Sequence, residues 1–173
     1  MFTQNFSVWI YDAYMKRSIA DYKYYGRTEY TRFYAANIVG RLGRKLMLRG
    51  VEALVPVPCS RKRKRYRGYN QAELLAKAVG AELDIRVMNL LLRAKETKAQ
   101  NGLNRSERKN NLSGALMWNS AYSKNGINVP EIVAVVDDIF TTGSTMDECS
   151  RVLLQNGVKK VYGVCICIGD DRA

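Results

Sequence analysis

Two acidic residues and a run of small hydroxyl residues lie close together near the C-terminal end of the sequence. The acids are Asp137 and Asp138, and the run reads Thr141, Thr142, Gly143, Ser144 and Thr145. At the start of a helix, such a run can turn several backbone N–H groups toward one point, where the helix dipole also favours negative charge. The hydroxyl groups add further donors. The run therefore predicts a site for a phosphate monoester.

The two acids predict a different contact, because a carboxylate repels a phosphate but accepts hydrogen bonds from sugar hydroxyls. Acids beside a phosphate cradle are therefore typical of a site for a ribose 5-phosphate. The alternative is that the acids belong to a helix-capping turn and that the run is only a polar loop. Neither the P-loop pattern nor the dinucleotide fingerprint G-x-G-x-x-G occurs, so those two modes of phosphate binding are excluded.

The flanking elements predict how the acids and the hydroxyl run are held. Residues 132–136 are apolar and mostly β-branched, which predicts a buried strand followed by a loop over residues 137–145. Residues 146–155 predict a helix that ends at Asn156-Gly157, and residues 158–168 predict one more strand. Ligands of open α/β sheets collect at the carboxyl ends of the strands, so the acids stand where a ligand would bind.

The rest of the chain predicts further helices and strands. Residues 8–49 predict helices with a break at Tyr25-Gly26-Arg27, and residues 53–58 predict a short buried strand. Residues 70–80 predict a helix that ends at its glycine. The polar stretch over residues 93–111 predicts a mobile loop. We therefore expect one compact α/β domain, with a mainly parallel sheet covered by helices on both faces.

The composition excludes several kinds of catalytic and metal site. The 173 residues contain no histidine, which removes the usual general base, the Ser-His and Cys-His nucleophiles and a histidine-ligated zinc site. The four cysteines form no Cys-x-x-Cys pair, so we expect free thiols and no zinc. Neither a membrane span nor a signal peptide is recognisable, which predicts a cytoplasmic protein.

A strongly basic segment predicts contact with a polyanion. The chain has 28 Lys and Arg against 16 Asp and Glu, a formal net charge of +12. Six of these cations surround one tyrosine in the run Arg61, Lys62, Arg63, Lys64, Arg65, Tyr66 and Arg67. Cations neutralise phosphates and aromatic rings stack on bases, so the run is a candidate site for single-stranded DNA. The alternative is a solvated basic surface that keeps the protein soluble.

Four stretches of the sequence resemble a known family. Residues 135–145 resemble the motif by which type I phosphoribosyltransferases bind 5-phosphoribosyl-1-pyrophosphate (PRPP). Residues 55–58 together with Arg67-Gly68-Tyr69-Asn70-Gln71-Ala72, the pattern over residues 93–111, and Lys23-Tyr24-Tyr25-Gly26 resemble the ComF family of competence-associated phosphoribosyltransferase-like proteins. The matching pieces occur in order and cover nearly the whole chain.

The resemblance implies a type I phosphoribosyltransferase-like fold, with residues 1–50 as a helical N-terminal hood and residues 51–173 as the core. It implies that Asp137 and Asp138 contact the ribose hydroxyls of PRPP and that the turn from Thr141 to Thr145 holds its 5-phosphate. Mg²⁺ would come with PRPP, without direct protein ligands.

The resemblance also directs attention to the pyrophosphate of PRPP. We expect the turn Cys59-Ser60-Arg61 to hold this group, and Arg93 and Lys95 to close over it from the mobile loop. The alternative for Arg93 and Lys95 is that they only keep the protein soluble. Cations in such places stabilise the charge that develops on the leaving group.

Two classes of function stay open after this comparison. In the first, the chain is a phosphoribosyltransferase with an unidentified acceptor. In the second, it is a non-catalytic adaptor in DNA uptake that binds a nucleotide or single-stranded DNA. Competence implies a helicase and recombination-mediator proteins as possible partners. Many ComF members carry an N-terminal four-cysteine zinc module, and this sequence has no cysteines that could form one.

Overall fold

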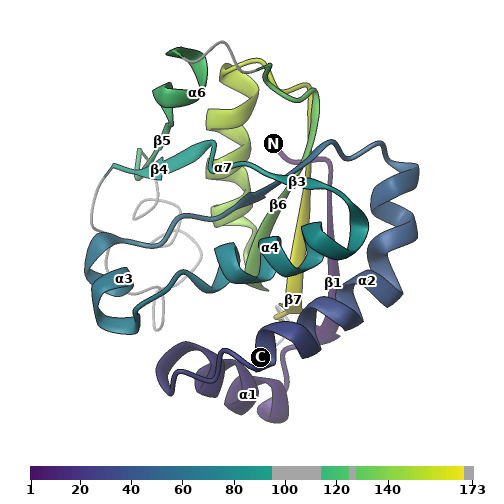
Figure 1. The fold of residues 1–173 in the computed structure, drawn as a ribbon, viewed down its shortest axis with the longest axis vertical. Coiled ribbons are helices and arrows are strands. Elements are labelled where there is room, and N and C mark those ends of the chain that lie inside the picture. The colour runs from purple at the N-terminus through teal and green to yellow at the C-terminus, as the bar shows by residue number, and fades with distance from the viewer. Residues whose placement is uncertain (95–113, 125–127, 170–173) are drawn as a thin grey trace.

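Five strands form one parallel sheet at the centre of the molecule (Figure 1). The computed structural model describes residues 1–94, 114–124 and 128–169. In sheet order the strands are β1 (Gln4–Ile10), β7 (Lys160–Ile168), β6 (Ile132–Phe140), β2 (Ala53–Pro56) and β3 (Arg86–Val87). All four neighbouring pairs are parallel. The prediction of a mainly parallel sheet in an α/β fold is confirmed.

Helices cover both faces of this sheet. The first face carries α1 (Ala13–Tyr24), α2 (Tyr30–Leu48) and α4 (Gln71–Leu83), and the second face carries α7 (Ser144–Gln155). Alternate residues of β6 serve the two layers: Ala134 packs with Tyr34 and Leu75 in the first core, and Val135 packs with Met146 in the second. No helix in the described ranges is long and apolar enough to cross a membrane.

The N-terminal segment differs from its prediction. Residues 8–10 were expected to be helical, but residues 4–10 form β1, which pairs with β7 from Gln4 opposite Tyr162 to Ile10 opposite Ile168. The strand lies at the edge of the sheet, and its apolar side chains do not alternate strictly with polar ones. The two-residue period that indicates a strand is therefore not visible in its sequence. The predicted break is confirmed, because α1 ends at Tyr24 and α2 begins at Tyr30.

Three boundaries near the expected site also differ from their predictions. The helix α4 does not end at Gly80 as predicted but continues to Leu83. Gly80 is there for close packing and not as a helix end, because a Cβ at this position would lie 2.5 Å from the Ile85 carbonyl oxygen. The strand β6 extends to Phe140, since its pairing with β7 continues to that residue, so the two acids lie in the strand and not in a loop. The helix α7 begins at Ser144, two residues before its predicted start.

Shorter elements complete the described structure. The basic run forms α3 (Arg61–Arg67), and α6 (Ser120–Lys124) follows a two-stranded antiparallel hairpin of β4 (Leu91–Arg93) and β5 (Leu116–Trp118). The hairpin begins in the apolar run before the predicted mobile loop. Residues 95–111 of that predicted loop, Lys95 among them, lie outside the described residues.

Candidate functional site

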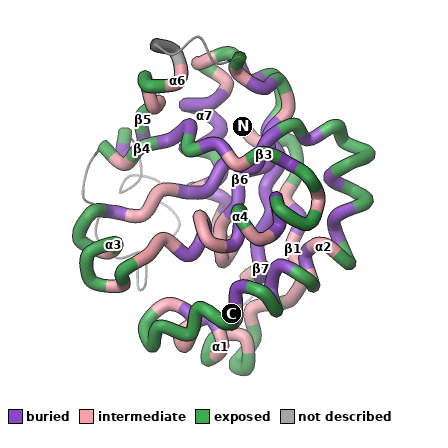
Figure 2. Tube along the Cα trace, viewed as in Figure 1, coloured by how far each residue is buried: buried purple, intermediate pink, exposed green. Residues whose placement is uncertain are grey.

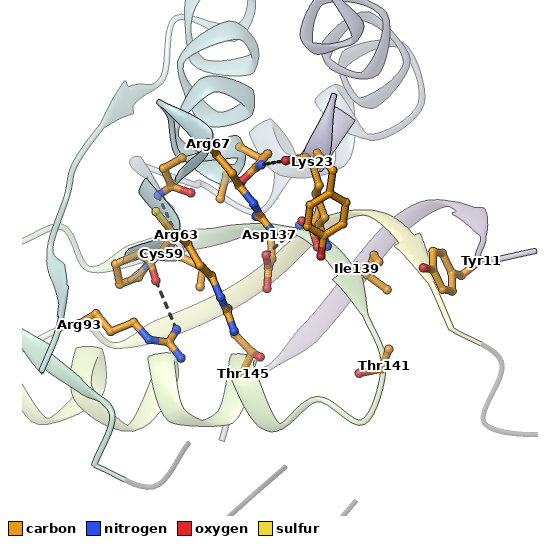
Figure 3. Close-up of a pocket in the computed structure, with 17 residues that line it drawn as sticks. Tyr11, Lys23, Cys59, Arg63, Arg67, Arg93, Asp137, Ile139, Thr141 and Thr145 are labelled. Atoms are coloured by element: carbon orange, nitrogen blue, oxygen red, sulfur yellow. Dashed lines mark hydrogen bonds and ion pairs between the residues drawn. The ribbon is translucent and has the colours of Figure 1, made fainter. Parts of the chain in front are cut away.

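A cavity of about 260 Å³ opens at the carboxyl ends of β2 and β6 (Figure 3). Its walls come from six elements (α1, α3, α4, β4, β6 and α7) and from the turns that follow the two strands. Residues that line it include Lys23, Tyr24, Cys59, Arg63, Arg67, Arg93, Asp137, Asp138, Thr141 and Thr145. The structure thus brings together residues from the predicted ribose, phosphate, pyrophosphate and nucleic-acid groups, which are up to 86 positions apart in the sequence (from 59 to 145).

The hydroxyl run forms the N-terminus of α7, as the sequence predicts. Gly143 adopts a left-handed conformation with φ of +78°, and a Cβ at this position would lie 3.3 Å from the Phe140 ring. The Thr142 and Ser144 hydroxyl oxygens lie 2.9 Å apart in a hydrogen bond. The first backbone N–H groups of a helix have no intrahelical partner, so this turn provides several donors at one end of the cavity.

The two acids lie at the C-terminal end of β6 and have different surroundings. The backbone N–H of Asp138 donates to Asp137 Oδ1 at 2.9 Å. Burial, and then the charge of Asp138, raises the pKa of Asp137 to about 7. Asp137 therefore changes charge near neutral pH, whereas Asp138 has a cation beside it. Figure 3 shows Asp137 pointing into the cavity.

Lys23 supplies that cation from the last turn of α1. Its Nζ lies 2.8 Å from Asp138 Oδ2, and the two side chains are only 19% and 16% exposed. Burial acts to lower the pKa of Lys23, but the charge of Asp138 and the hydrogen bond to it outweigh this effect and raise that pKa. Lys23 was not assigned to the site from the sequence. The sequence feature that could have identified Lys23 is the resemblance of the Lys23-Tyr24-Tyr25-Gly26 stretch to the ComF family.

Hydrogen bonds fix the end of α1 against the start of α4. The Tyr69 hydroxyl donates to the Tyr22 carbonyl oxygen at 2.7 Å, and Gln71 Nε2 donates to the Lys23 carbonyl oxygen at 3.4 Å. The Tyr22 hydroxyl also donates to the Gln71 carbonyl oxygen at 3.2 Å. The first two bonds use backbone oxygens of α1 and the third uses the Tyr22 side chain of α1, so together they hold Lys23 in place over β6.

The turn after β2 combines a structural and a cavity-lining role. The Ser60 side chain is buried and accepts a hydrogen bond from the Arg63 backbone N–H at 3.3 Å, so it caps α3. Cys59 lines the cavity, and burial raises the pKa of its thiol despite the charges of Lys64 and Arg67. The thiol is therefore protonated at neutral pH.

A second cavity of about 570 Å³ adjoins the first along this turn. Cys59 and Arg93 line both cavities, whereas Ser60 and Arg61 line only the second. Arg93 comes from β4, and its Nη1 donates to the Pro58 carbonyl oxygen at 3.4 Å. The structure therefore joins Arg93 to the predicted pyrophosphate turn. Lys95, its predicted companion, is outside the described residues.

The basic run separates into two groups because it forms a helix. Arg63 and Arg67, four residues apart, face the cavity. Arg67 Nη1 donates to Gln71 Oε1 at 3.1 Å, and its guanidinium lies 4.8 Å from the centroid of the Tyr24 ring. Figure 3 shows Arg63 pointing into the cavity toward Thr145. The remaining members of the run are exposed: Arg61, Lys62, Lys64, Arg65 and Tyr66.

The arrangement suits a ligand with anionic groups at both ends and hydroxyls between them. The N-terminus of α7 offers donors, α3 and β4 supply cations, and β6 supplies the two acids, all in the lining of this one cavity. Among the described residues, no cluster of three or more Cys, Asp or Glu side chains could hold a metal by itself. A divalent cation that arrives on a phosphorylated ligand would need only a nearby carboxylate, which Asp137 and Asp138 offer.

Comparison with known proteins agrees with the motifs around this cavity, although no family model matches the chain. Competence protein F of Haemophilus influenzae is 42% identical over 111 residues, which are 64% of this chain and 47% of that protein. Competence protein ComFC of Streptococcus pneumoniae is 31% identical over 156 residues, which are 90% of this chain and 64% of that protein. The chain belongs to the ComF family.

This ComF-family chain is also similar to a DNA utilization protein. DNA utilization protein YhgH of Escherichia coli K12 is 31% identical over 120 residues, 67% of the chain and 49% of that protein. The chain spans between 47% and 64% of the length of these curated relatives. Family membership, which the motifs predicted, is confirmed. The absence of a zinc module stays a prediction.

Proposed function

We propose that the cavity binds PRPP as its magnesium complex and that the chain acts in DNA uptake. One observation carries the proposal: the N-terminus of α7, the acids of β6 and the arginines of α3 and β4 line a single cavity, and a ribose with phosphates on C5 and C1 requires all three kinds of group. The relatives are competence proteins and DNA utilization proteins by name, which supports the cellular role.

The 5-phosphate of PRPP binds the turn from Thr141 to Thr145. The backbone N–H groups of this turn and the hydroxyls of Thr142 and Ser144 donate to its oxygens, and the dipole of α7 favours its charge. Gly143 allows this approach because of its left-handed conformation.

The ribose hydroxyls donate to the carboxylates of Asp137 and Asp138. Lys23 orients Asp138 for this contact, since Lys23 Nζ lies 2.8 Å from Asp138 Oδ2. Ionised Asp137 only accepts hydrogen bonds, whereas protonated Asp137 also donates one, so the raised pKa of this residue makes the contact dependent on pH.

The pyrophosphate lies toward the turn after β2, where Arg63 and Arg93 supply positive charge. If transfer takes place, the bond between C1 and the pyrophosphate oxygen breaks as positive charge builds on the ribose ring, and an acceptor nucleophile forms the new bond to C1. The arginines then stabilise the negative charge on the leaving group. Bound Mg²⁺ would add positive charge at the phosphate oxygens, and Asp137 and Asp138 are the cavity carboxylates that could face it.

Titration calorimetry with a panel of ligands tests this proposal. The wild-type protein should bind PRPP with Mg²⁺ more tightly than ribose 5-phosphate or pyrophosphate alone, because each of these fills only part of the cavity. The variant Asp137→Asn/Asp138→Asn should lose this preference. Asp84→Asn is a matched control, since this exposed acid ends α4 in a left-handed conformation that asparagine tolerates. Equal affinity for PRPP and pyrophosphate in the wild type would contradict a ribose site.

A second candidate function, binding of single-stranded DNA by α3, has its own supporting observation. The helix directs only Arg63 and Arg67 into the cavity and leaves Lys62, Lys64 and Arg65 exposed beside Tyr66, whose side chain is 79% exposed. Affinity for an oligothymidylate should fall with salt, with a log–log slope of roughly −0.7 for each phosphate contact. Charge reversal at the three exposed cations should flatten that slope. A salt response that charge reversal leaves unchanged would refute this candidate.

A further inference from the structure

The helix α2 carries a second basic surface that the proposed function does not use. Its 19 residues include no acid, and five exposed cations lie on it or at its C-terminal cap: Arg32, Arg41, Arg44, Lys45 and Arg49. Figure 1 shows α2 and α3 on opposite sides of the molecule, and Figure 2 shows exposed stretches along the outer side of α2. The two basic helices are therefore separate surfaces.

The cations of α2 are not neutralised by neighbouring acids. None of the five forms an ion pair within the part of the chain that the structure describes. The acids that flank α2 have other partners: Glu29 pairs with Arg27 at 3.3 Å, and Glu52 accepts hydrogen bonds from the backbone N–H groups of residues 131 and 132. The positive charge on this helix is thus available to an external anion.

Three of the cations form a regular row. Arg41, Lys45 and Arg49 are spaced by four residues, and Phe33 and Asn37 extend the same row toward the start of α2. Successive members lie about 6 Å apart along the helix, because each residue rises about 1.5 Å. A linear row of charges at even spacing suits a linear polyanion better than a single small anion.

Aromatic rings lie beside this row on the edge of the sheet. The Phe33 ring is stacked on the Trp9 ring of β1, with centroids 5.8 Å apart and planes at 17°, and Phe33 is 57% exposed. The Arg41 guanidinium lies 6.0 Å from the Trp9 ring centroid, and that of Arg49 lies 5.9 Å from the ring of Tyr162 on β7. An exposed ring at the head of the row can stack on an unpaired base.

We infer that the row Phe33, Asn37, Arg41, Lys45 and Arg49, with Trp9, binds single-stranded nucleic acid, with phosphates on the cations and a base on the aromatic pair. Single strands fit better than duplexes, because bases inside a duplex are stacked on one another and cannot reach Phe33. This surface goes beyond the proposed function, which concerns the cavity and α3.

Fluorescence of Trp9 tests the inference directly, because the chain has only two tryptophans. In the full chain with Trp118→Phe, Trp9 is the sole reporter, and an oligothymidylate should quench its emission. The same oligonucleotide should leave the emission of the Trp9→Phe protein, which reports Trp118, nearly unchanged. Absence of quenching in the Trp9 reporter, in protein shown by circular dichroism to be folded, would overturn the inference.

Matched charge variants separate a specific row from a general charge effect. Arg41→Gln/Lys45→Gln/Arg49→Gln and Lys16→Gln/Arg17→Gln/Lys160→Gln each remove three exposed cations from the formal charge of +12. The first variant should lose on the order of tenfold or more in affinity at 0.1 M salt, and its log–log salt slope should fall by about 2, at roughly 0.7 per contact. Equal losses in both variants would refute the row.

Two further experiments distinguish this surface from the cavity and from a membrane-binding surface. Quenching should persist in Asp137→Asn/Asp138→Asn protein, and Phe33→Ala should weaken it while leaving the cations intact. Vesicles of anionic phospholipid serve as the competing probe, because basic surfaces with exposed apolar residues also bind membranes. A response of Trp9 to such vesicles and not to the oligonucleotide would overturn the inference in favour of a lipid surface.

Discussion

At the scale of single residues, the candidate site depends on how two adjacent carboxyl groups acquire different properties. Asp138 lies 2.8 Å from Lys23, whereas Asp137 is buried and feels the charge of Asp138. The sequence predicted both acids and their role as hydroxyl acceptors. It did not predict their asymmetry, because the cation that creates it comes from a helix more than one hundred positions earlier in the chain.

The raised pKa of Asp137 predicts a pH dependence of stability. Its pKa in the folded protein is about 7, above the ordinary value of 3.8, so the folded state binds more protons than the unfolded state between these values. The free energy of unfolding should therefore fall as pH rises from about 4 to about 7, by an amount on the order of a few kcal/mol, since one pKa unit is about 1.4 kcal/mol. Asp137→Asn should flatten this part of the profile in urea titrations. An unaltered slope would contradict the assignment.

The ion pair between Lys23 and Asp138 predicts a coupling that a double-mutant cycle can measure. Lys23→Met leaves a largely buried carboxylate without its cation and should cost about 3 kcal/mol of unfolding free energy, within the range for broken buried pairs. Adding Asp138→Asn should restore much of this loss, because the uncompensated charge is then gone. Additive effects of the two substitutions in guanidinium titrations would show that the pair contributes nothing.

At the scale of elements, the sequence predicted those with long apolar runs and misplaced those whose limits depend on neighbours. The strand β6 was found because residues 132–136 form a continuous apolar run, and α7 because of its stop at Asn156-Gly157. The extension of β6 to Phe140 depends on pairing with β7. The strand β1 was missed because an edge strand of seven residues beside helical sequence carries little periodic signal. Lys95 and the rest of the predicted mobile loop stay predictions.

Alanine substitutions at Gly80 and Gly40 test whether close packing or helix propensity determines the effect of a helix glycine on stability. By helix propensity alone, each change to alanine should stabilise the protein by up to about 1 kcal/mol. Gly40→Ala in α2 should do so, because a Cβ there meets nothing within 4 Å. Gly80→Ala should instead destabilise by about 1–3 kcal/mol, because its Cβ would lie 2.5 Å from the Ile85 oxygen. Thermal unfolding that shows the same sign for both would contradict the packing argument.

At the scale of the whole molecule, the hood and the core predicted from the sequence share one hydrophobic cluster. Tyr34 and Ile38 of α2 pack in the same cluster as Leu75 of α4 and Val164 of β7. The boundary at residue 50 between the hood and the core stays a prediction. The sequence indicated one compact domain, but a single sequence does not show which helix covers which face.

The shared cluster predicts that residues 51–173 do not fold alone. Without the preceding segment, the first face of the sheet would expose buried residues such as Leu54, Leu75 and Val164, and β7 would lose its pairing with β1. We expect this fragment to lack a cooperative thermal transition and to be digested quickly by proteases at 25 °C. A fragment with a sharp transition near that of the full chain would show an independent core.

If one cavity holds all three parts of PRPP, a crystal structure of the protein soaked with PRPP and Mg²⁺ will show them there. We expect the 5-phosphate at the turn from Thr141 to Thr145, the ribose hydroxyls on Asp137 and Asp138, and the pyrophosphate beside Arg63 and Arg93. Density for the 5-phosphate away from the N-terminus of α7, or a ribose without contact to either acid, would refute the proposed binding mode.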